Sequence, residues 1–230
     1  MDQCPYATAV GSLMYAQTCT RTDISFAVCM FSRYQSDPGM MHWVGVKKVL
    51  RYLIGTRNYR LSYRKSDQLE VIGYSDSDFT GCLDTRKSTS GYIFLLAGGA
   101  VSWRSAKQTL VTPSTFDAEY VACFEATSQA LWMQDFITGL RMMDTISKPL
   151  KIFCNNDAAR RFPQNDKVSS KSKFLEVKYF VLKEKVRDRL VSIVGAPTSQ
   201  MIADPLTKTL APKAYREHVR NIGLIDLPYY

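Results

Sequence analysis

The feature that most constrains the fold is the order of strand-like and helix-like segments that follows residue 67. Three segments typical of strands come first, and then a long helical segment, a strand, a second helical segment and a last strand. In chain order these segments cover residues 69–76, 91–96, 100–104, 114–140, 151–154, 172–187 and 190–194. This order predicts an α/β sandwich built on a mixed sheet.

The residues on either side of this region have helical patterns. Apolar residues spaced three or four apart predict two helices within residues 6–35 and a third over 41–53, which Gly55 ends. Further helical pieces are expected near 199–209 and 212–222, and we interpret the run 203–208 as packing and capping of the terminal helix. The predicted organisation is therefore a helical segment (1–66), an α/β domain (67–198) and a C-terminal helical extension (199–230).

Composition excludes several classes of protein. The chain is 46% apolar and 22% charged, as in ordinary globular domains, and no apolar run is long enough to span a membrane. The amino terminus lacks a basic start followed by an apolar run, so we expect no secretory signal and an intracellular location in the cytoplasm, a virus-like particle or the nucleus. Six cysteines without a CxxC pair and only two histidines argue against a disulfide framework and a zinc site.

Charge is distributed unevenly along the chain. The net charge of +9 divides into +4 for residues 1–70, −3 for residues 71–146 and +8 for residues 147–230. A positive surface attracts phosphate backbones, and an acidic centre within it suits a metal-dependent nuclease. A generic solvated basic face explains the same numbers equally well.

Four polar side chains are predicted at the ends of elements, where they can converge over one edge of the sheet. Asp76 ends the first strand, Glu119 begins the long helix, Asn155 follows the fourth strand and Glu176 lies in the later helix. Such a group can hold two magnesium ions that clamp the attacking and leaving oxygens of a phosphodiester. From spacing alone, each carboxylate is better explained as a helix cap, a salt-bridge partner or a solvated side chain.

The motifs of this chain resemble those at the C-terminal end of copia-type retrotransposon Pol polyproteins. The similarity is most specific in the runs 73–82 and 86–92. The other matching segments are 10–15, 20–24, 42–43, 48–53, 98–104, 114–122, 130–132, 154–156 and 203–208. The resemblance covers nearly the whole chain. It identifies 67–198 as a ribonuclease H-like domain with a mixed five-stranded sheet, and 1–66 as similar to the helices that follow the reverse transcriptase core.

The resemblance implies cleavage of RNA in RNA–DNA hybrids with Mg²⁺ as the cofactor, which Mn²⁺ can replace. Asp76 and Glu119 match the first two acidic positions of the family. The third position, normally Asp, is Asn155, and the fourth, also normally Asp, is matched to Glu176. One lost charge weakens a two-metal site, so we expect weak or no cleavage, unless Asp157 replaces the missing carboxylate.

Basic and aromatic residues near these motifs are candidate contacts for a nucleic acid. They are Arg86, Lys87, Ser88, Trp103, Arg104, Lys171, Lys173 and Lys178. A solvated turn explains the first three as well, and burial explains Trp103 at least as well as stacking on a nucleotide. The expected partners are an RNA–DNA hybrid or another nucleic acid and the reverse transcriptase part of Pol, with no membrane.

Two alternatives remain open. The chain lacks the paired-aspartate polymerase motif and any protease or integrase pattern, so it resembles the tail of a Pol polyprotein with its own Met1. The first alternative is therefore a catalytically inert remnant that binds nucleic acid. The opening half also resembles copia-like reading frames that are classed as secreted RxLR effectors. The tetrapeptide at residues 48–51, Lys-Val-Leu-Arg, is not an RxLR sequence and falls in a predicted helix.

Overall fold

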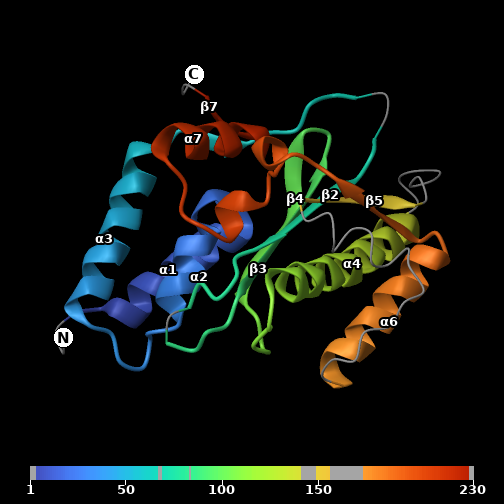
Figure 1. Ribbon diagram of the computed structural model, residues 1–230. Coiled ribbons are helices and arrows are strands. Elements are labelled where there is room, and N and C mark those ends of the chain that lie inside the picture. The colour runs from blue at the N-terminus through green and yellow to red at the C-terminus, as the bar shows by residue number, and fades with distance from the viewer. Residues whose placement is uncertain (1–3, 67–68, 83, 141–148, 156–172, 228–230) are drawn as a thin grey trace.

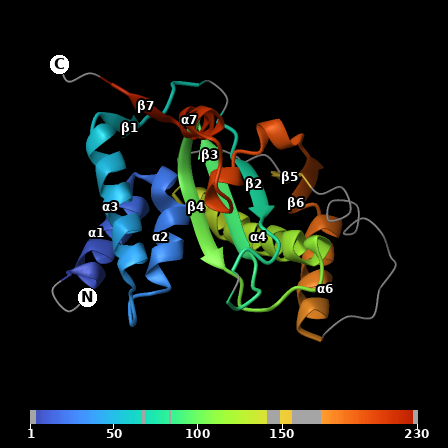
Figure 2. The same cartoon turned by 60° about the vertical axis from the view of Figure 1, so that its left-hand side comes forward.

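The centre of the protein is a five-stranded sheet with the strand order β4-β3-β2-β5-β6 (Figures 1 and 2). The computed structural model describes residues 4–66, 69–82, 84–140, 149–155 and 173–227. The strands are β2 (Ile72–Ser77), β3 (Thr89–Leu96), β4 (Gly99–Lys107), β5 (Leu150–Cys154) and β6 (Val191–Gly195). β2, β3 and β4 pair antiparallel, whereas β5 runs parallel to both β2 and β6. The predicted mixed five-stranded sheet is therefore confirmed.

Two helices cover one face of the sheet. α4 (Thr115–Gly139) lies across β2 and β3, and α6 (Lys173–Arg187) packs against α4. Ser114 caps the start of α4, because its hydroxyl accepts a hydrogen bond from the Asp117 backbone N–H. The core beneath α4 includes Tyr92 and Phe94 of β3.

The opposite face of the sheet is covered by the C-terminal residues. Ile93 and Leu95 alternate with Tyr92 and Phe94 along β3, so they point to this second face, where they pack with Leu206. The covering elements are η4 (Asp204–Leu206) and α7 (Pro212–Asn221), and the exposed turn η3 (Thr198–Gln200) precedes them in the chain. β3 is buried on both faces for this reason, and the C-terminal extension forms a layer of the structure.

A second, two-stranded sheet joins distant parts of the chain. β1 (Tyr59–Leu61) pairs antiparallel with β7 (Leu224–Asp226). The predicted organisation contained neither strand, since three residues are too few to show a strand period. Their pairing fixes residues shortly after the N-terminal helices beside the C-terminal residues.

The N-terminal segment is helical, as expected, and the structure places it beside β4 (Figure 2). Its elements are α1 (Tyr6–Cys19), η1 (Thr22–Ile24), α2 (Ser25–Ser32) and α3 (Met40–Gly55). Their shared apolar core contains Val10, Leu13, Val28 and Val46. In the described part of the chain, no helix has the length and apolar character needed to cross a membrane.

A buried polar network connects this helical unit to α7. The Asp23 carboxylate accepts two hydrogen bonds from the Arg21 guanidinium, at 3.0 and 2.7 Å, and one from the Tyr52 hydroxyl at 2.6 Å. The backbone oxygen of Asp23 accepts a fourth from the Tyr215 hydroxyl at 2.8 Å. Buried charges are tolerated when they are paired in this way, so the network orients the helical unit against the C-terminal layer.

Replacing Asp23 with alanine should lower the free energy of unfolding by about 3–5 kcal/mol, because it leaves the Arg21 guanidinium buried without its carboxylate. Urea unfolding followed by circular dichroism measures the change. Asp37→Ala, at an exposed position, is the matched control and should change stability by about 0.5 kcal/mol or less. Equal stability of the two variants would contradict the role given to this network.

Candidate active site

Asp76 lies near the end of β2, where two parallel strands finish side by side. The register pairs Tyr74 of β2 with Phe153 of β5, so both strands reach the same edge of the sheet. Asn155, the first residue after β5, consequently comes beside Asp76, and its Nδ2 is 3.5 Å from Asp76 Oδ1. Asp76 itself is fully buried.

Glu119 reaches the same place from α4. It lies in the second turn of the helix and is 7% exposed. Its carboxylate receives a hydrogen bond from the backbone of Ser77, which follows Asp76, and the Cys154 thiol lies 3.9 Å from Oε2. The structure therefore brings Asp76, Glu119 and Asn155 together at one edge of the sheet.

A second set of polar groups comes from the C-terminal layer, and the sequence interpretation missed it. The Thr207 hydroxyl donates a hydrogen bond to Asp76 Oδ2. Lys208 Nζ lies 3.5 Å from Asp76 Oδ2 and 2.9 Å from Asp204 Oδ1. The sequence predicts packing and capping for the run 203–208, and Leu206 does pack in the core. A buried acid followed by Thr and Lys within five residues was the available signal.

Gly91 explains how this layer comes so close to Asp76. Gly91 is the β3 residue paired with Asp76. A Cβ atom at this position would lie 2.7 Å from Thr207 Cγ2 and 2.8 Å from Leu206 Cβ, closer than such atoms can approach. The missing side chain therefore leaves the space in which η4 and Thr207 contact the strand pair.

Glu176 lies in α6, whose contacts are mainly with α4. Lys208 and Asp204 are the charged side chains with the largest influence on the pKa of Asp76. The role of Glu176 as a fourth acidic group stays a prediction. Asp157 lies outside the described residues.

Burial gives the clustered acids unusual proton affinities. Burial, opposed by Lys208 and reinforced by Asp204, raises the pKa of Asp76 to about 6. Burial and the charge of Asp76 also raise the pKa of Glu119. Burial lowers the pKa of Lys208, but the carboxylates of Asp76 and Asp204 outweigh it, so this pKa is raised overall. These shifts show that like charges are crowded together in a site of low polarity.

His218 of α7 lies close to the same group. It is 8% exposed, and its Nδ1 has no hydrogen-bond partner within the described residues. Burial lowers its pKa, while the charge of Asp204 acts in the opposite direction. A neutral imidazole is therefore favoured beside Asp204 at neutral pH.

The donor atoms of this group suit a hard divalent cation. Asp76, Glu119 and Asp204 offer carboxylate oxygens, and Asn155 offers an amide oxygen, which are ligand types that Mg²⁺ and Mn²⁺ prefer. In the described part of the chain, no three His, Cys, Asp or Glu side chains are arranged closely enough to hold an ion. The Lys208 ammonium, a monovalent cation, lies between Asp76 and Asp204. The residues therefore fit a divalent ion by the chemistry of their donor atoms, and in this structure the Lys208 ammonium contacts two of the carboxylates.

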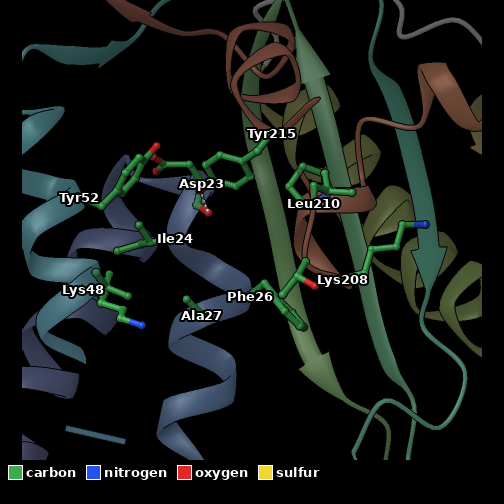
Figure 3. A pocket seen from close by; sticks show the side chains of 12 residues that line it. Asp23, Ile24, Phe26, Ala27, Lys48, Tyr52, Lys208, Leu210 and Tyr215 are labelled. Carbon is green, nitrogen blue, oxygen red and sulfur yellow. Dashed lines mark hydrogen bonds between the residues drawn. The ribbon is translucent and has the colours of Figure 1, made fainter. Parts of the chain in front are cut away.

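A cavity of about 320 Å³ lies on the other side of Lys208 (Figure 3). Its wall combines Ile24, Ala27 and Tyr52 of the helical unit with Leu210 and Tyr215 of the C-terminal layer. Figure 3 shows Lys208 extending away from these side chains toward the sheet. The cavity does not include Asp76 or Glu119, so it is separate from the acidic group.

The predicted nucleic-acid contacts differ in their surroundings. Arg86 and Arg104 are exposed, and Arg86 has a positive φ of 53° in its turn. Lys87 is half-buried, as is Lys178, whose ammonium lies 4.6 Å from the centre of the Phe124 ring. These four basic side chains stay predicted contacts.

Two other predicted contacts have structural partners. Ser88 is fully buried, and its hydroxyl accepts a hydrogen bond from the Thr80 backbone N–H at 3.2 Å. The Trp103 indole N–H donates to the Gln17 backbone oxygen at 2.9 Å, which joins β4 to α1. Lys171 and the side chain of Lys173 lie outside the described residues.

Proteins of known sequence resemble this chain over most of its length. It is 39% identical over 210 residues to the Retrovirus-related Pol polyprotein from transposon TNT 1-94 of Nicotiana tabacum, a match that covers 91% of this chain and 16% of the relative. It is 35% identical over 227 residues to the Retrovirus-related Pol polyprotein from transposon RE2 of Arabidopsis thaliana, a match that covers 99% of this chain and 15% of the relative. The chain thus spans about one sixth of these relatives.

A shorter relative matches part of the chain. Secreted RxLR effector protein 161 of Plasmopara viticola is 46% identical over 133 residues, which cover 58% of this chain and 94% of the relative. No family model matches the sequence.

Solved structures with a similar fold include LC11-RNase H1 in complex with RNA/DNA hybrid. That similarity has a TM-score of 0.44 and 20% identity and covers 60% of this chain and 94% of that one. The similarity to the foamy viral protease-reverse transcriptase in complex with RNA/DNA hybrid has a TM-score of 0.42 and 18% identity. It covers 74% of this chain and 26% of that one. Both TM-scores are below 0.5.

Asp76→Asn should make stability less dependent on pH. The pKa of Asp76 in the folded chain is about 6, above the value of about 4 for an unfolded chain. The folded protein therefore holds the proton more strongly, and the free energy of unfolding falls as pH rises from about 4 to about 6. The Asp76→Asn variant lacks this carboxyl group. At pH 7 its free energy of unfolding should therefore be about 1–3 kcal/mol higher than that of the unsubstituted protein.

Urea unfolding in EDTA at pH 4.5 and pH 7 measures this difference. Glu70→Gln, which removes an exposed partner of Lys151, is the control and should follow the unsubstituted protein at both pH values. An Asp76→Asn variant with the same pH profile as the control would rule out the raised pKa.

Gly91→Ala should lower the free energy of unfolding by about 1–3 kcal/mol, because the added methyl group displaces Thr207 and Leu206. Thermal and urea unfolding measure the loss. The control is Gly11→Ala in α1, where an added Cβ meets nothing within 4 Å and alanine should stabilise the helix by up to about 1 kcal/mol. Stabilisation by both substitutions would contradict a close approach at Gly91.

Proposed function

Because the chain belongs to the family of copia-type retrotransposon Pol polyproteins, we propose that it binds RNA–DNA hybrids and cleaves their RNA strand slowly, with a divalent ion. Its α/β part is a ribonuclease H-like domain. The observation that carries the proposal is the convergence of Asp76, Glu119 and Asn155 at one sheet edge with Asp204 nearby. These side chains come from four separate parts of the chain.

Asp76, Glu119 and Asp204 would hold Mg²⁺, or Mn²⁺ in its place, together with the amide oxygen of Asn155. A divalent ion at this position supplies Lewis-acid stabilisation of the phosphate and an activated water. The side chains contribute negative charge and orientation, since Ser77 holds the Glu119 carboxylate and Thr207 holds that of Asp76. All of these groups are close to β2.

Asn155 makes the site weaker than one with four carboxylates. It offers an oxygen without a negative charge, and the repulsion between two divalent ions must be offset by nearby anions. We therefore propose that one ion binds well, that the second binds poorly, and that cleavage is slow. An aspartate at this position would supply the missing charge beside Asp76.

Asp204 is proposed to take the fourth acidic position in place of Glu176. Asp204 is 3% exposed, its charge raises the pKa of Asp76, and both carboxylates contact Lys208. The two assignments predict different effects of substitution.

Basic side chains would bind the phosphate backbones of the hybrid. Arg86 is exposed on the loop before β3, the strand next to β2, Arg104 is exposed on the edge strand β4, and Lys178 lies on α6. Such contacts make the logarithm of the affinity fall in proportion to the logarithm of the salt concentration. The reverse transcriptase part of Pol is the proposed protein partner.

Cleavage of an RNA–DNA hybrid with Mg²⁺ or Mn²⁺ tests the proposal. We expect slow cleavage that Asp76→Asn abolishes, and Asn155→Asp should increase the rate by roughly tenfold or more, since even outer-shell substitutions change activity by this factor. Asp204→Asn should reduce the rate strongly, and Glu176→Gln should change it little. The measurement is single-turnover cleavage of a labelled hybrid.

Three results would contradict parts of this proposal. Equal rates for the unsubstituted protein and Asp76→Asn would leave an inert nucleic-acid-binding remnant, provided that hybrid affinity still falls with salt. Loss of activity in Glu176→Gln but not in Asp204→Asn would restore the assignment made from sequence. Salt-independent or undetectable binding of hybrid would exclude the function altogether.

A further inference from the structure

Lys208 places a positive charge inside the acidic group. Its Nζ lies 2.9 Å from Asp204 Oδ1 and 3.5 Å from Asp76 Oδ2, so one ammonium contacts carboxylates from two distant parts of the chain. The Asp76 side chain is 1% exposed and that of Asp204 is 5% exposed. Within the described residues, Lys208 is the cation that the structure places in contact with both acids.

The backbone of η4 determines this position. The N–H groups of Thr207 and Lys208 both donate to the Asp204 backbone oxygen, at 3.1 Å. This turn places the Lys208 side chain on the same side as Asp204, four residues earlier, while Thr207 bonds to Asp76. The ammonium is therefore positioned by the fold and does not reach the acids by chance from a flexible surface.

The ammonium and a divalent ion compete for the same carboxylate oxygens. Two cations a few ångströms apart repel each other strongly in a site of low polarity. Lys208 must therefore withdraw before an ion can contact Asp76 and Asp204 together. The side chain has room to do so, because it is 35% exposed and Lys208 is one of the residues that line the 320 Å³ cavity.

We propose that Lys208 is a resident counter-cation. Its ammonium group neutralises the carboxylates of Asp76 and Asp204 when no metal is bound, and it is displaced when a divalent ion binds. This inference rests on the proposed function, since it requires that the acids bind a divalent ion. Lys208 acts here as a positioning residue for the acids. It stabilises the metal-free fold and weakens the affinity for the metal.

Substitution of Lys208 by methionine tests the inference without relying on activity. Mn²⁺ binding is measured by calorimetry and by electron paramagnetic resonance at pH 8, where Asp76 is ionised. We expect Lys208→Met to bind Mn²⁺ roughly fivefold or more tightly than the unsubstituted protein, because the competing charge is gone. In EDTA the same variant should have a lower Tm than the unsubstituted protein. Saturating Mn²⁺ should raise the Tm of the variant by more than it raises that of the unsubstituted protein.

Two further variants keep the result interpretable. Lys208→Arg retains the positive charge and should bind Mn²⁺ as weakly as the unsubstituted protein. Lys213→Met removes the same charge from an exposed position on α7 and should change neither affinity nor Tm. If Lys208→Met unfolds, Lys208→Gln, which retains a polar end group, replaces it with the same expected gain in affinity.

Equal or weaker Mn²⁺ binding by the charge-removing variants, with clear binding by the unsubstituted protein, would overturn the counter-cation while leaving the metal site in place. Absence of Mn²⁺ binding in every variant, including Asn155→Asp, would overturn the metal site of the proposed function as well. If Lys213→Met gains as much Mn²⁺ affinity as Lys208→Met does, the gain is a general effect of charge, and this result would also overturn the inference.

Discussion

The close contact between the C-terminal layer and the β2–β3 pair is the constraint on which the structure depends. It is possible only because Gly91 presents no side chain opposite Leu206 and Thr207. The contact buries the second face of β3, and it also places Thr207 and Lys208 against Asp76. Packing of the core and assembly of the acidic group are therefore consequences of the same contact.

The acidic group itself opposes folding. Burial raises the pKa values of Asp76 and Glu119, which means that their ionised forms are less favourable in the folded chain than in water. Hydrophobic clusters on both faces of the sheet surround these acids and provide the stability that the acids remove. Such an arrangement is typical of sites where function and stability impose opposite demands.

Sequence periodicity predicted the elements of this fold well because their patterns are local. The spacing of apolar residues predicts the long helix, and the five strands of the main sheet are predicted in their order along the chain, although not in their order within the sheet. The convergence of Asp76, Glu119 and Asn155 was expected because strand ends and helix starts meet at one sheet edge. Their proposed roles came from the family resemblance.

The features that the sequence did not reveal depend on contacts between distant residues. β1 and β7 are three residues each and form only by pairing across most of the chain. Asp204 and Lys208 looked like part of a terminal helix, since nothing in their immediate surroundings indicates contact with Asp76. Trp103 was considered for stacking, but its indole donates to a helix that ends more than eighty residues earlier.

That indole contact has a consequence for the sheet as a whole. β4 is an edge strand, and unpaired edges readily recruit strands from other molecules. The N-terminal helices lie against β4 and are attached through Trp103 and Gln17, so they shield this edge (Figure 2). A fragment cut just ahead of the main sheet would expose it, and self-association would then limit how such a fragment could be handled in solution.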